Sequence, residues 1–512
     1  MPIIGSLIKS AIELRSKMPA ENRQGNPVAA QKKVLRRLIR KAQLTSFGEH
    51  YGFSEILKSK NTIEDFRNNV PLHDYNKMHN DWWYRALSGE AYVSWPGRVK
   101  YFALSSGTSE ASSKYIPVTA DMIRAIKKIS VRQLVSLARY DIPKDFFKRG
   151  ILMLGGSTHL NYNGTYYEGD LSGITTGNIP FWFQHHYKPG KRISKERDWE
   201  TKLEEIIKKA PEWDIGAIVG VPAWFQILLK KIIDRYDLEH IHEIWPNLHI
   251  FTHGGVSFAP YISSFEKLVG REMIYMETYL ASEGFIAYQN RPGTKSMSLV
   301  CDNGIFYEFV PFNDDNFDFE GNLKPDAKTL TLGEVEIDKE YALLLSTNAG
   351  AWRYLIGDVV RFTSLNPPEI LIVGRTKHYL SICGEHLSQE NMNRAIEMYE
   401  QDNNVSIPEF TVAGLPYENM FQHKWWIGSS DHIDPMHLSS EIDKYLKKLN
   451  DDYRVERIAA IRKVEAEVLP VDMFYDFLKS QGKVGAQIKF PRVMKKHLPD
   501  WLKYLESVQK ST

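Results

Sequence analysis

Cysteine is scarce in this chain: Cys301 and Cys383 are the only two among 512 residues. So few cysteines exclude a disulfide framework and suit a reducing compartment, so a cytoplasmic protein is expected. The sequence also lacks any apolar run near the roughly 18 uncharged residues that a membrane span needs. Lys9 interrupts the N-terminal apolar stretch, which is too short for a signal peptide. The net charge is only +2, which gives no reason to expect nucleic acid as a partner.

The chain does have the length and apolar content for two or more domains, with 43% hydrophobic and 12% aromatic residues. Apolar runs at 150–155, 215–221 and 247–252 alternate with amphipathic segments at 120–140, 199–209 and 222–234. This alternation predicts an α/β domain with a parallel-rich sheet flanked by helices. Ligands of such sheets lie at the carboxyl ends of the strands, and Gly254 and Gly255 follow the third run.

The pattern changes at about residue 297. Short strands separated by turns are expected at 305–310, 333–337, 341–345, 359–362 and 369–373. They predict a β-barrel-like subdomain over about 297–374. Mixed α/β character then resumes. The expected organisation is therefore a large N-terminal domain, residues 1–376, and a small mobile α+β C-terminal domain, residues 377–512.

A loop rich in hydroxyl groups lies between two apolar runs at 101–104 and 115–119. It contains Ser105, Ser106, Gly107, Thr108 and Ser109. Hydroxyls and backbone N–H groups around one glycine suit phosphate oxygens. A serine-rich surface turn explains this loop equally well when it is considered alone.

Three later stretches have related content. Residues 277–284 place hydroxyls and an aromatic ring before the carboxylate of Glu283, residues 352–358 end in Gly357 and Asp358, and residues 483–492 carry Lys489. Taken singly, each stretch has a simpler explanation: Glu283 as a surface carboxylate, Asp358 as a turn former and Lys489 as a solvated lysine.

In order along the chain, however, the four stretches resemble the motifs of the acyl acid amido synthetases. This family is of the auxin-responsive Gretchen Hagen type, and it includes plant enzymes that conjugate auxin and jasmonate to amino acids. It belongs to the adenylate-forming superfamily, together with acyl-CoA ligases and luciferases. The matching residues are Ser105 to Ser109, Tyr279 to Glu283, Tyr354 with Gly357 and Asp358, and Gln487, Lys489, Pro491 and Arg492. Ala111, Leu355 and His386 depart from the family pattern.

The resemblance implies ATP-dependent adenylation of a carboxylic acid, followed by transfer of the acyl group to the amine of an amino acid. ATP and Mg²⁺ are the implied cofactors. Lys489 and Glu283 are the implied catalytic residues: the lysine would reach the α-phosphate and the glutamate would hold Mg²⁺. The implied nucleotide-binding residues are Ser105, Ser106, Gly107, Thr108, Ser109, Gly254, Gly255, Thr278, Tyr279, Ser282, Asp358 and Arg375.

Three other functions stay open. The same first step could serve a ligase that uses coenzyme A or another thiol as acceptor. A serine hydrolase would explain the near match of residues 107–111 to Gly-x-Ser-x-Gly, but its His-Gly-Gly loop should precede the serine, whereas His253 follows it. A non-catalytic nucleotide-binding protein is the third. The sequence identifies neither the acid, the amine nor the oligomeric state.

Overall fold

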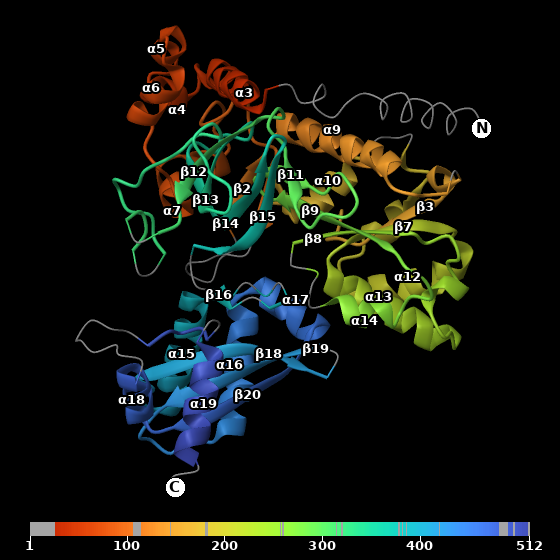
Figure 1. Ribbon diagram of the computed structural model, residues 1–512, viewed down its shortest axis with the longest axis vertical. Coiled ribbons are helices and arrows are strands. Elements are labelled where there is room, and N and C mark those ends of the chain that lie inside the picture. Colours follow the sequence, from red (N-terminus) through yellow and green to blue (C-terminus); the bar gives the residue numbers. More distant parts are fainter. Residues whose placement is uncertain are drawn as a thin grey trace. The chain divides into compact units, whose positions relative to one another are not determined.

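The computed structural model describes residues 26–105, 114–143, 145–179, 183–255, 258, 261–313, 315–318, 321–376, 379–380, 382–383, 385, 387–418, 420–480, 490–494 and 497–509 (Figure 1). The described residues between 26 and 376 form one compact unit, and those between 379 and 509 form a second.

The first unit is built on one large mixed sheet. Its strands are β3 (Gly150–Met153), β6 (Tyr187–Lys188), β7 (Ile215–Gly220), β8 (Ile250–Gly254), β9 (Ile274–Ala281), β10 (Gly284–Tyr288), β11 (Met297–Leu299), β12 (Ile305–Pro311), β13 (Glu340–Thr347), β14 (Tyr354–Leu365) and β15 (Pro368–Arg375). Across the described residues the strand order is β12-β13-β14-β15-β11-β10-β9-β8-β7-β3-β6. The neighbours from β6 to β9 pair in parallel, and those from β9 to β12 pair antiparallel. The predicted parallel strands are thus confirmed, and β9 belongs to both halves.

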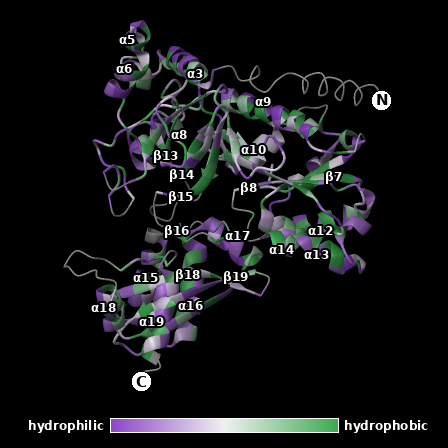
Figure 2. Cartoon of the chain, in the orientation of Figure 1, coloured by the Kyte–Doolittle hydropathy of each residue, from purple (hydrophilic) through white to green (hydrophobic). Residues whose placement is uncertain are grey.

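Helices cover both faces of the parallel half, as predicted. Those of the first unit are α3 (Pro27–Ala42), α4 (Ser46–His50), α5 (Phe53–Lys58), α6 (Thr62–Asn69), α7 (Tyr75–Met78), α8 (Tyr84–Leu87), α9 (Ala120–Ser136), α10 (Leu171–Gly177), α11 (Lys191–Ser194), α12 (Trp199–Lys209), α13 (Pro222–Tyr236) and α14 (Ile262–Glu266). Figure 1 shows α9 on one side of β7 and β8, with α12 and α13 on the other. The Thr119 side chain caps α9, and Pro222 begins α13. Both apolar and polar residues occur along α9 and α12 (Figure 2), as amphipathic surface helices require.

A small second sheet carries the predicted strand-loop-strand segment. It consists of β1 (Tyr101–Ser105), β2 (Lys114–Val118), β4 (Asn161–Tyr162) and β5 (Tyr167–Gly169), in the order β2-β1-β5-β4. The strands β1 and β2 are antiparallel, with Ser105 opposite Lys114. The two predicted strands that flank the hydroxyl loop are therefore confirmed.

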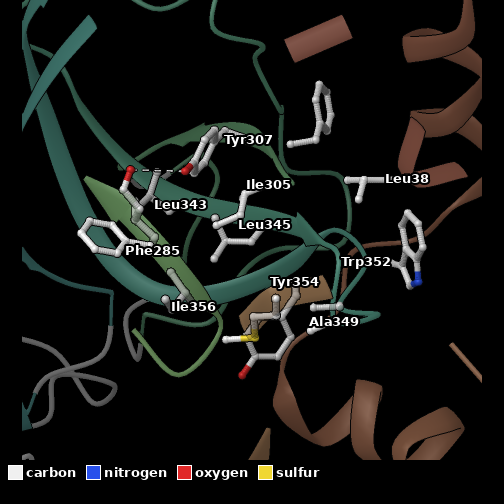
Figure 3. Close-up of a cluster of buried hydrophobic side chains, with 14 of the residues drawn as sticks. Leu38, Phe285, Ile305, Tyr307, Leu343, Leu345, Ala349, Trp352, Tyr354 and Ile356 are labelled. Atoms are coloured by element: carbon white, nitrogen blue, oxygen red, sulfur yellow. Dashed lines mark hydrogen bonds between the residues drawn. The ribbon is translucent and has the colours of Figure 1, made fainter. Parts of the chain in front are cut away.

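The antiparallel half of the large sheet contains the main core. Figure 3 shows Leu38 of α3, Ile305 of β12 and Leu345 of β13 in one cluster with Trp352, and all four are at most 3% exposed. The indole nitrogen of Trp352 donates to the carbonyl of Ser94 at 3.0 Å. Each such buried side chain contributes about 1.5–3 kcal/mol. This cluster therefore fixes α3 against the sheet.

The predicted β-barrel-like subdomain is wrong. In the described residues β11 to β15 extend the large sheet and form no closed barrel. The strand predicted at 333–337 is also wrong, because this segment consists of turns and irregular backbone. The backbone N–H of Glu336 donates there to the phenol of Tyr341 at 3.0 Å instead of to a neighbouring strand.

The second unit has mixed α/β character. Its strands are β16 (Tyr379–Leu380), β17 (Leu387–Ser388), β18 (Glu409–Tyr417), β19 (Met420–Gly428) and β20 (Ile461–Leu469), and its helices are α15 (Gln389–Asn403), α16 (Pro435–Leu449), α17 (Asp451–Ala459), α18 (Val471–Ser480) and α19 (Leu498–Gln509). A three-stranded sheet, β18-β19-β20, is the larger of its two described sheets. Trp501 of α19 packs on Phe474 and Phe477 of α18 at ring-centroid distances of 5.3 and 5.1 Å.

Among the described helices, none is both long enough and apolar enough to cross a membrane.

Candidate active site

Two glycines lie at the carboxyl end of β8, as the sequence predicted. Gly254 is opposite Thr278 in the parallel pair of β8 and β9. A Cβ atom on Gly254 would lie 2.3 Å from the carbonyl oxygen of Thr278, so this position requires glycine. Gly255 follows with a φ of +84°, in the left-handed region. Glycine at this strand end therefore lets the end of β8 lie close against β9.

Thr278 and Tyr279 are neighbours on β9 and point to opposite faces of the sheet. The hydroxyl of Thr278 accepts a hydrogen bond from Nε2 of Gln133, on α9, at 2.7 Å. The phenol of Tyr279 donates to the carboxylate of Asp358, on β14. Thr278 therefore anchors the strand to a helix, whereas Tyr279 belongs to the polar cluster on the other face.

Asp358 is held at both of its carboxylate oxygens. Tyr279 donates to Oδ2, and Nε of Arg375 lies 3.0 Å from Oδ1. Asp358 and Arg375 are register partners in β14 and β15. Gly357, with a φ of +93°, precedes the carboxylate on its strand. The structure thus brings together Tyr279, Asp358 and Arg375, three predicted nucleotide-binding residues from separate strands.

Glu283 lies in the turn between β9 and β10 and is only 7% exposed. Burial raises the pKa of its carboxyl to about 7, and the charge of Asp358 acts in the same direction. The positive charges of Lys114 and Arg375 oppose this rise in the pKa. Glu283 is therefore close to its titration point at neutral pH, as groups at functional sites often are.

Lys114 was not among the predicted site residues, but its charge acts on Glu283. It is the first residue of β2, and its positive charge is the strongest influence that lowers the pKa of Glu283. Its Nζ also lies 5.4 Å from the ring centroid of Tyr75. The phenol of Tyr75 accepts the backbone N–H of Tyr115 at 2.9 Å. The signal in the sequence was a lysine directly after the hydroxyl loop, but nothing local paired it with Glu283.

A second carboxyl, that of the half-buried Glu277, lies two residues before Tyr279 and on the same face of β9. Burial raises its pKa to about 7. Its register partner on β8 is His253, whose pKa burial lowers to about 4. At pH 7 the imidazole of His253 is therefore neutral and the carboxyl of Glu277 is only partly ionised, next to the glycines at the end of β8.

The remaining predicted site residues fall into two groups. Ser105 ends β1, and Ser282 precedes Glu283 in the β9–β10 turn; both are half-buried. Ser106, Gly107, Thr108, Ser109 and Lys489 lie outside the described residues. Their assignments stay predictions.

In the second unit, Arg492 of the fourth motif is a structural residue. Its guanidinium pairs with the carboxylate of Glu409 at 2.6 Å and lies 4.4 Å from the ring centroid of Phe410. The backbone N–H of Val412, on β18, donates to the carbonyl of Arg492 at 3.1 Å. Residues 490–494 are thereby fixed along β18.

A buried glutamate–histidine pair lies near the beginning of the same unit. Glu385 and His423 are both fully buried, with Nε2 of the histidine 3.0 Å from Oε1 of the glutamate. The backbone N–H groups of Ile382 and Cys383 also donate to Glu385, each at 2.9 Å. These contacts hold the carboxylate of Glu385 in its charged form, with a pKa of about 2 despite its burial.

This arrangement, a parallel sheet that ends in two glycines beside a tyrosine, two carboxylates and an arginine, defines an α/β protein with polar groups at the carboxyl ends of its strands. The fold is similar to that of two solved ligase structures. A solved structure of GH3.15 acyl acid amido synthetase matches it with a TM-score of 0.59 at 18% identity, over 95% of this chain and 94% of the other. A 2-hydroxyisobutyryl-CoA ligase matches with a TM-score of 0.55 at 13% identity, over 97% and 94% of the two chains.

The family follows from sequence matches along most of the chain. The GH3 family N-terminal domain matches residues 19–160 and 156–274, its central domain 298–375 and its C-terminal domain 390–497. The chain belongs to the GH3 family. The resemblance drawn from the four motifs is thus confirmed.

Two curated relatives illustrate the distance within the family. An indole-3-acetic acid-amido synthetase of Arabidopsis thaliana, GH3.4, is 26% identical over 59% of this chain. The chain spans about half the length of that relative, 54%. The jasmonoyl–L-amino acid synthetase JAR4 of Nicotiana attenuata is 22% identical over 74% of this chain and 75% of its own length.

Proposed function

We propose that this protein is an ATP-dependent ligase that adenylates a carboxylic acid and then transfers the acyl group to the amine of an amino acid. The observation that carries the proposal is the cluster of Tyr279, Asp358 and Arg375 close to the buried Glu283. The printed activities of the relatives, amido synthetases that act on indole-3-acetic acid or jasmonate, support the same reaction class.

The first step joins the acid to AMP. An oxygen of the substrate carboxylate attacks the α-phosphorus of ATP, the bond from this phosphorus to the bridging oxygen breaks, and pyrophosphate leaves. Two anions must meet in this step, so positioning and preorganised donors supply most of the rate enhancement. No covalent enzyme nucleophile is needed.

The second step forms the amide. The amine nitrogen attacks the acyl carbon, the bond from this carbon to the phosphate oxygen breaks, and AMP leaves with the electron pair while the amine loses a proton to solvent. A thiol such as coenzyme A could take the place of the amine, and the acceptor test below separates the two.

In this proposal, different residues bind the ribose, the adenine and the phosphates of ATP. Asp358 accepts the ribose hydroxyls, since Tyr279 and Arg375 fix its carboxylate in place. Gly254 and Gly255 let the adenine lie against the backbone. Lys114 faces the phosphates from the start of β2. The hydroxyl loop from Ser105 to Ser109 and Lys489 complete the assignment as predictions from the motifs.

The carboxylate of Glu283 fits Mg²⁺ as a ligand. Glu283 is a buried oxygen donor whose negative charge is only partly compensated, since its pKa remains near 7 despite Lys114 and Arg375. Mg²⁺ in phosphate sites commonly takes one or two carboxylates, with substrate phosphates and water as its other ligands. Bound Mg²⁺ would neutralise phosphate charge, and Glu283 would be its protein ligand.

The test is ATP–pyrophosphate exchange over a panel of carboxylic acids, including indole-3-acetic and jasmonic acids. Exchange that depends on one of these acids supports adenylation. A folded protein that supports exchange with no acid of the panel contradicts the proposal. With the active acid, amino acids and coenzyme A are then offered in parallel, and an amide or a thioester product identifies the acceptor.

A further inference from the structure

A cavity of about 250 Å³ lies between α3 and α9, and it shares no residue with the candidate active site. Figure 1 shows the two helices as neighbours, and Lys41 of α3 forms an ion pair with Asp121 of α9. The lining residues are Arg37, Leu38, Lys41, Trp95, Asp121, Arg124, Ala125, Lys128, Asn303, Gly304 and Asn348.

The cations of this cavity form two matched pairs. Arg37 and Lys41 are four residues apart on α3, and Arg124 and Lys128 are four residues apart on α9. Residues at this spacing lie on one face of a helix, and like charges there destabilise the helix by about 0.2–0.5 kcal/mol. Both helices direct such a pair at the same cavity.

The carboxylate of the cavity compensates only part of this charge. Asp121 already accepts from Lys41, from Arg124 and, at 3.0 Å, from the indole nitrogen of Trp95. Arg37 has no ion-pair partner among the described residues. Lys128 acts electrostatically on Asp302, but both oxygens of Asp302 accept hydrogen bonds from Arg132 at 2.6 Å.

The remaining walls favour a small polar ligand. Trp95 is buried beneath Lys41, whose Nζ lies 5.6 Å from the indole centroid. The side-chain amide of Asn303 donates to the carbonyl of Ala125 at 2.7 Å, which fixes the turn before β12 against α9. A volume of about 250 Å³ is below the roughly 300–1,000 Å³ typical of pockets for drug-sized ligands. The cavity therefore suits a compact anion with several negative charges.

We propose that this cavity binds an oligophosphate, either free inorganic pyrophosphate or the phosphate tail of a nucleotide. Two guanidinium groups and two ammonium groups from facing helices match the charge and the oxygen-rich surface of such an anion. The proposal is independent of the proposed function, although pyrophosphate is a product of that reaction. It gives the protein a phosphate site outside its catalytic cluster.

The test compares pyrophosphate binding by isothermal titration calorimetry in three forms of the full chain. The double variant Arg37→Gln/Lys128→Gln removes the two cations that Asp121 does not hold. The control, Lys32→Gln/Lys33→Gln, removes two exposed cations of α3 that do not line the cavity. Wild type and control should each bind one more pyrophosphate per chain than the double variant does. If the double variant still fills this site, its affinity for pyrophosphate should be at least roughly tenfold weaker. Equal stoichiometry and affinity in all three forms, or an equal loss in the control, would overturn the proposal.

A further variant that should bind pyrophosphate more tightly distinguishes loss of the site from a folding defect. Asp121→Asn removes the competing carboxylate and releases Lys41 and Arg124, so it should bind pyrophosphate several-fold more tightly than wild type; weaker binding in a folded Asp121→Asn would contradict the site. Titrations with ATP and AMP identify the source of the phosphate. If ATP also fills the additional site, a nucleotide tail is accepted, whereas an additional site for pyrophosphate alone assigns the free ion.

Discussion

Asp358 and Arg375 face each other across the pair of β14 and β15, with Oδ1 of the aspartate 3.0 Å from Nε of the arginine. If Asp358 binds the ribose, Asp358→Asn should raise the KM for ATP at least roughly tenfold with a smaller change in kcat, because a binding contact is weakened. ATP–pyrophosphate exchange at varied ATP concentration measures this. Asp214→Asn is the control, since Asp214 also pairs with an arginine, Arg149, away from the site. An unchanged KM in Asp358→Asn would move the ribose contact elsewhere.

Glu283 makes the stability of the protein depend on pH. Its pKa is about 7 in the folded chain and about 4.5 when unfolded, so the folded state binds more protons between these values. The stabilising contribution is complete below about pH 4.5 and is lost as the pH rises through 7, which amounts to roughly 3 kcal/mol. Glu283→Gln should therefore become more stable relative to wild type as the pH rises from 5 to 8. Urea unfolding at both pH values tests this, and a constant difference between the two proteins would contradict it.

Lys114 should set the pH at which Glu283 becomes charged. Because its positive charge lowers the pKa of Glu283, Lys114→Met should move the rising limb of the pH profile of ATP–pyrophosphate exchange to higher pH. Lys114→Arg keeps the charge and should restore the wild-type profile. A uniform loss of rate with an unchanged profile would instead show that Lys114 acts on substrate binding alone.

The buried pair of Glu385 and His423 should be essential for the stability of the second unit. Glu385→Gln leaves His423 and two backbone N–H groups without their charged partner, and the loss of one member of a buried pair costs about 3–5 kcal/mol. Denaturant unfolding followed in the full chain measures this loss. Glu397→Gln removes an exposed carboxylate paired with Arg394 at 3.0 Å and should cost less than about 1 kcal/mol. Equal effects of the two changes would remove the special role of Glu385.

Lys489 is predicted from its motif to stabilise charge at the α-phosphate. Lys489→Ala should lower adenylation about 100-fold or more, as the loss of one strong charge-stabilising contact does. Lys479→Ala, which removes an exposed lysine paired with Asp476 at 3.0 Å, is the control. Exchange near the wild-type rate in Lys489→Ala would exclude this lysine from the first step.

Local sequence patterns were sufficient to predict the parallel half of the sheet. Buried strands, the proline at the start of α13 and the glycines after β8 all have signals within a few residues. The barrel prediction failed because short strands between turns look the same whether a sheet closes or extends. The segment 333–337 has strand-like alternation, but Glu336 finds its partner in a tyrosine phenol, which no local rule foresees.

The charge state of the candidate site was equally beyond the sequence. Glu283 was predicted as a metal ligand. Its pKa, however, is raised by burial and by Asp358, from β14, and lowered by Lys114, from β2. These elements are far apart along the chain and meet only in the folded unit. Gln133, which anchors Thr278, had no signal at all among the polar residues of α9.

The place of β9 in the sheet limits how this protein can be divided. It pairs in parallel with β8 along one edge and antiparallel with β10 along the other. A fragment that ends before Ile274 would leave the edge of β8 open, and a fragment that begins there would leave the other edge of β9 open. Open sheet edges favour aggregation. Separately expressed halves should therefore be recovered as a functional protein only when they are produced together and complement each other.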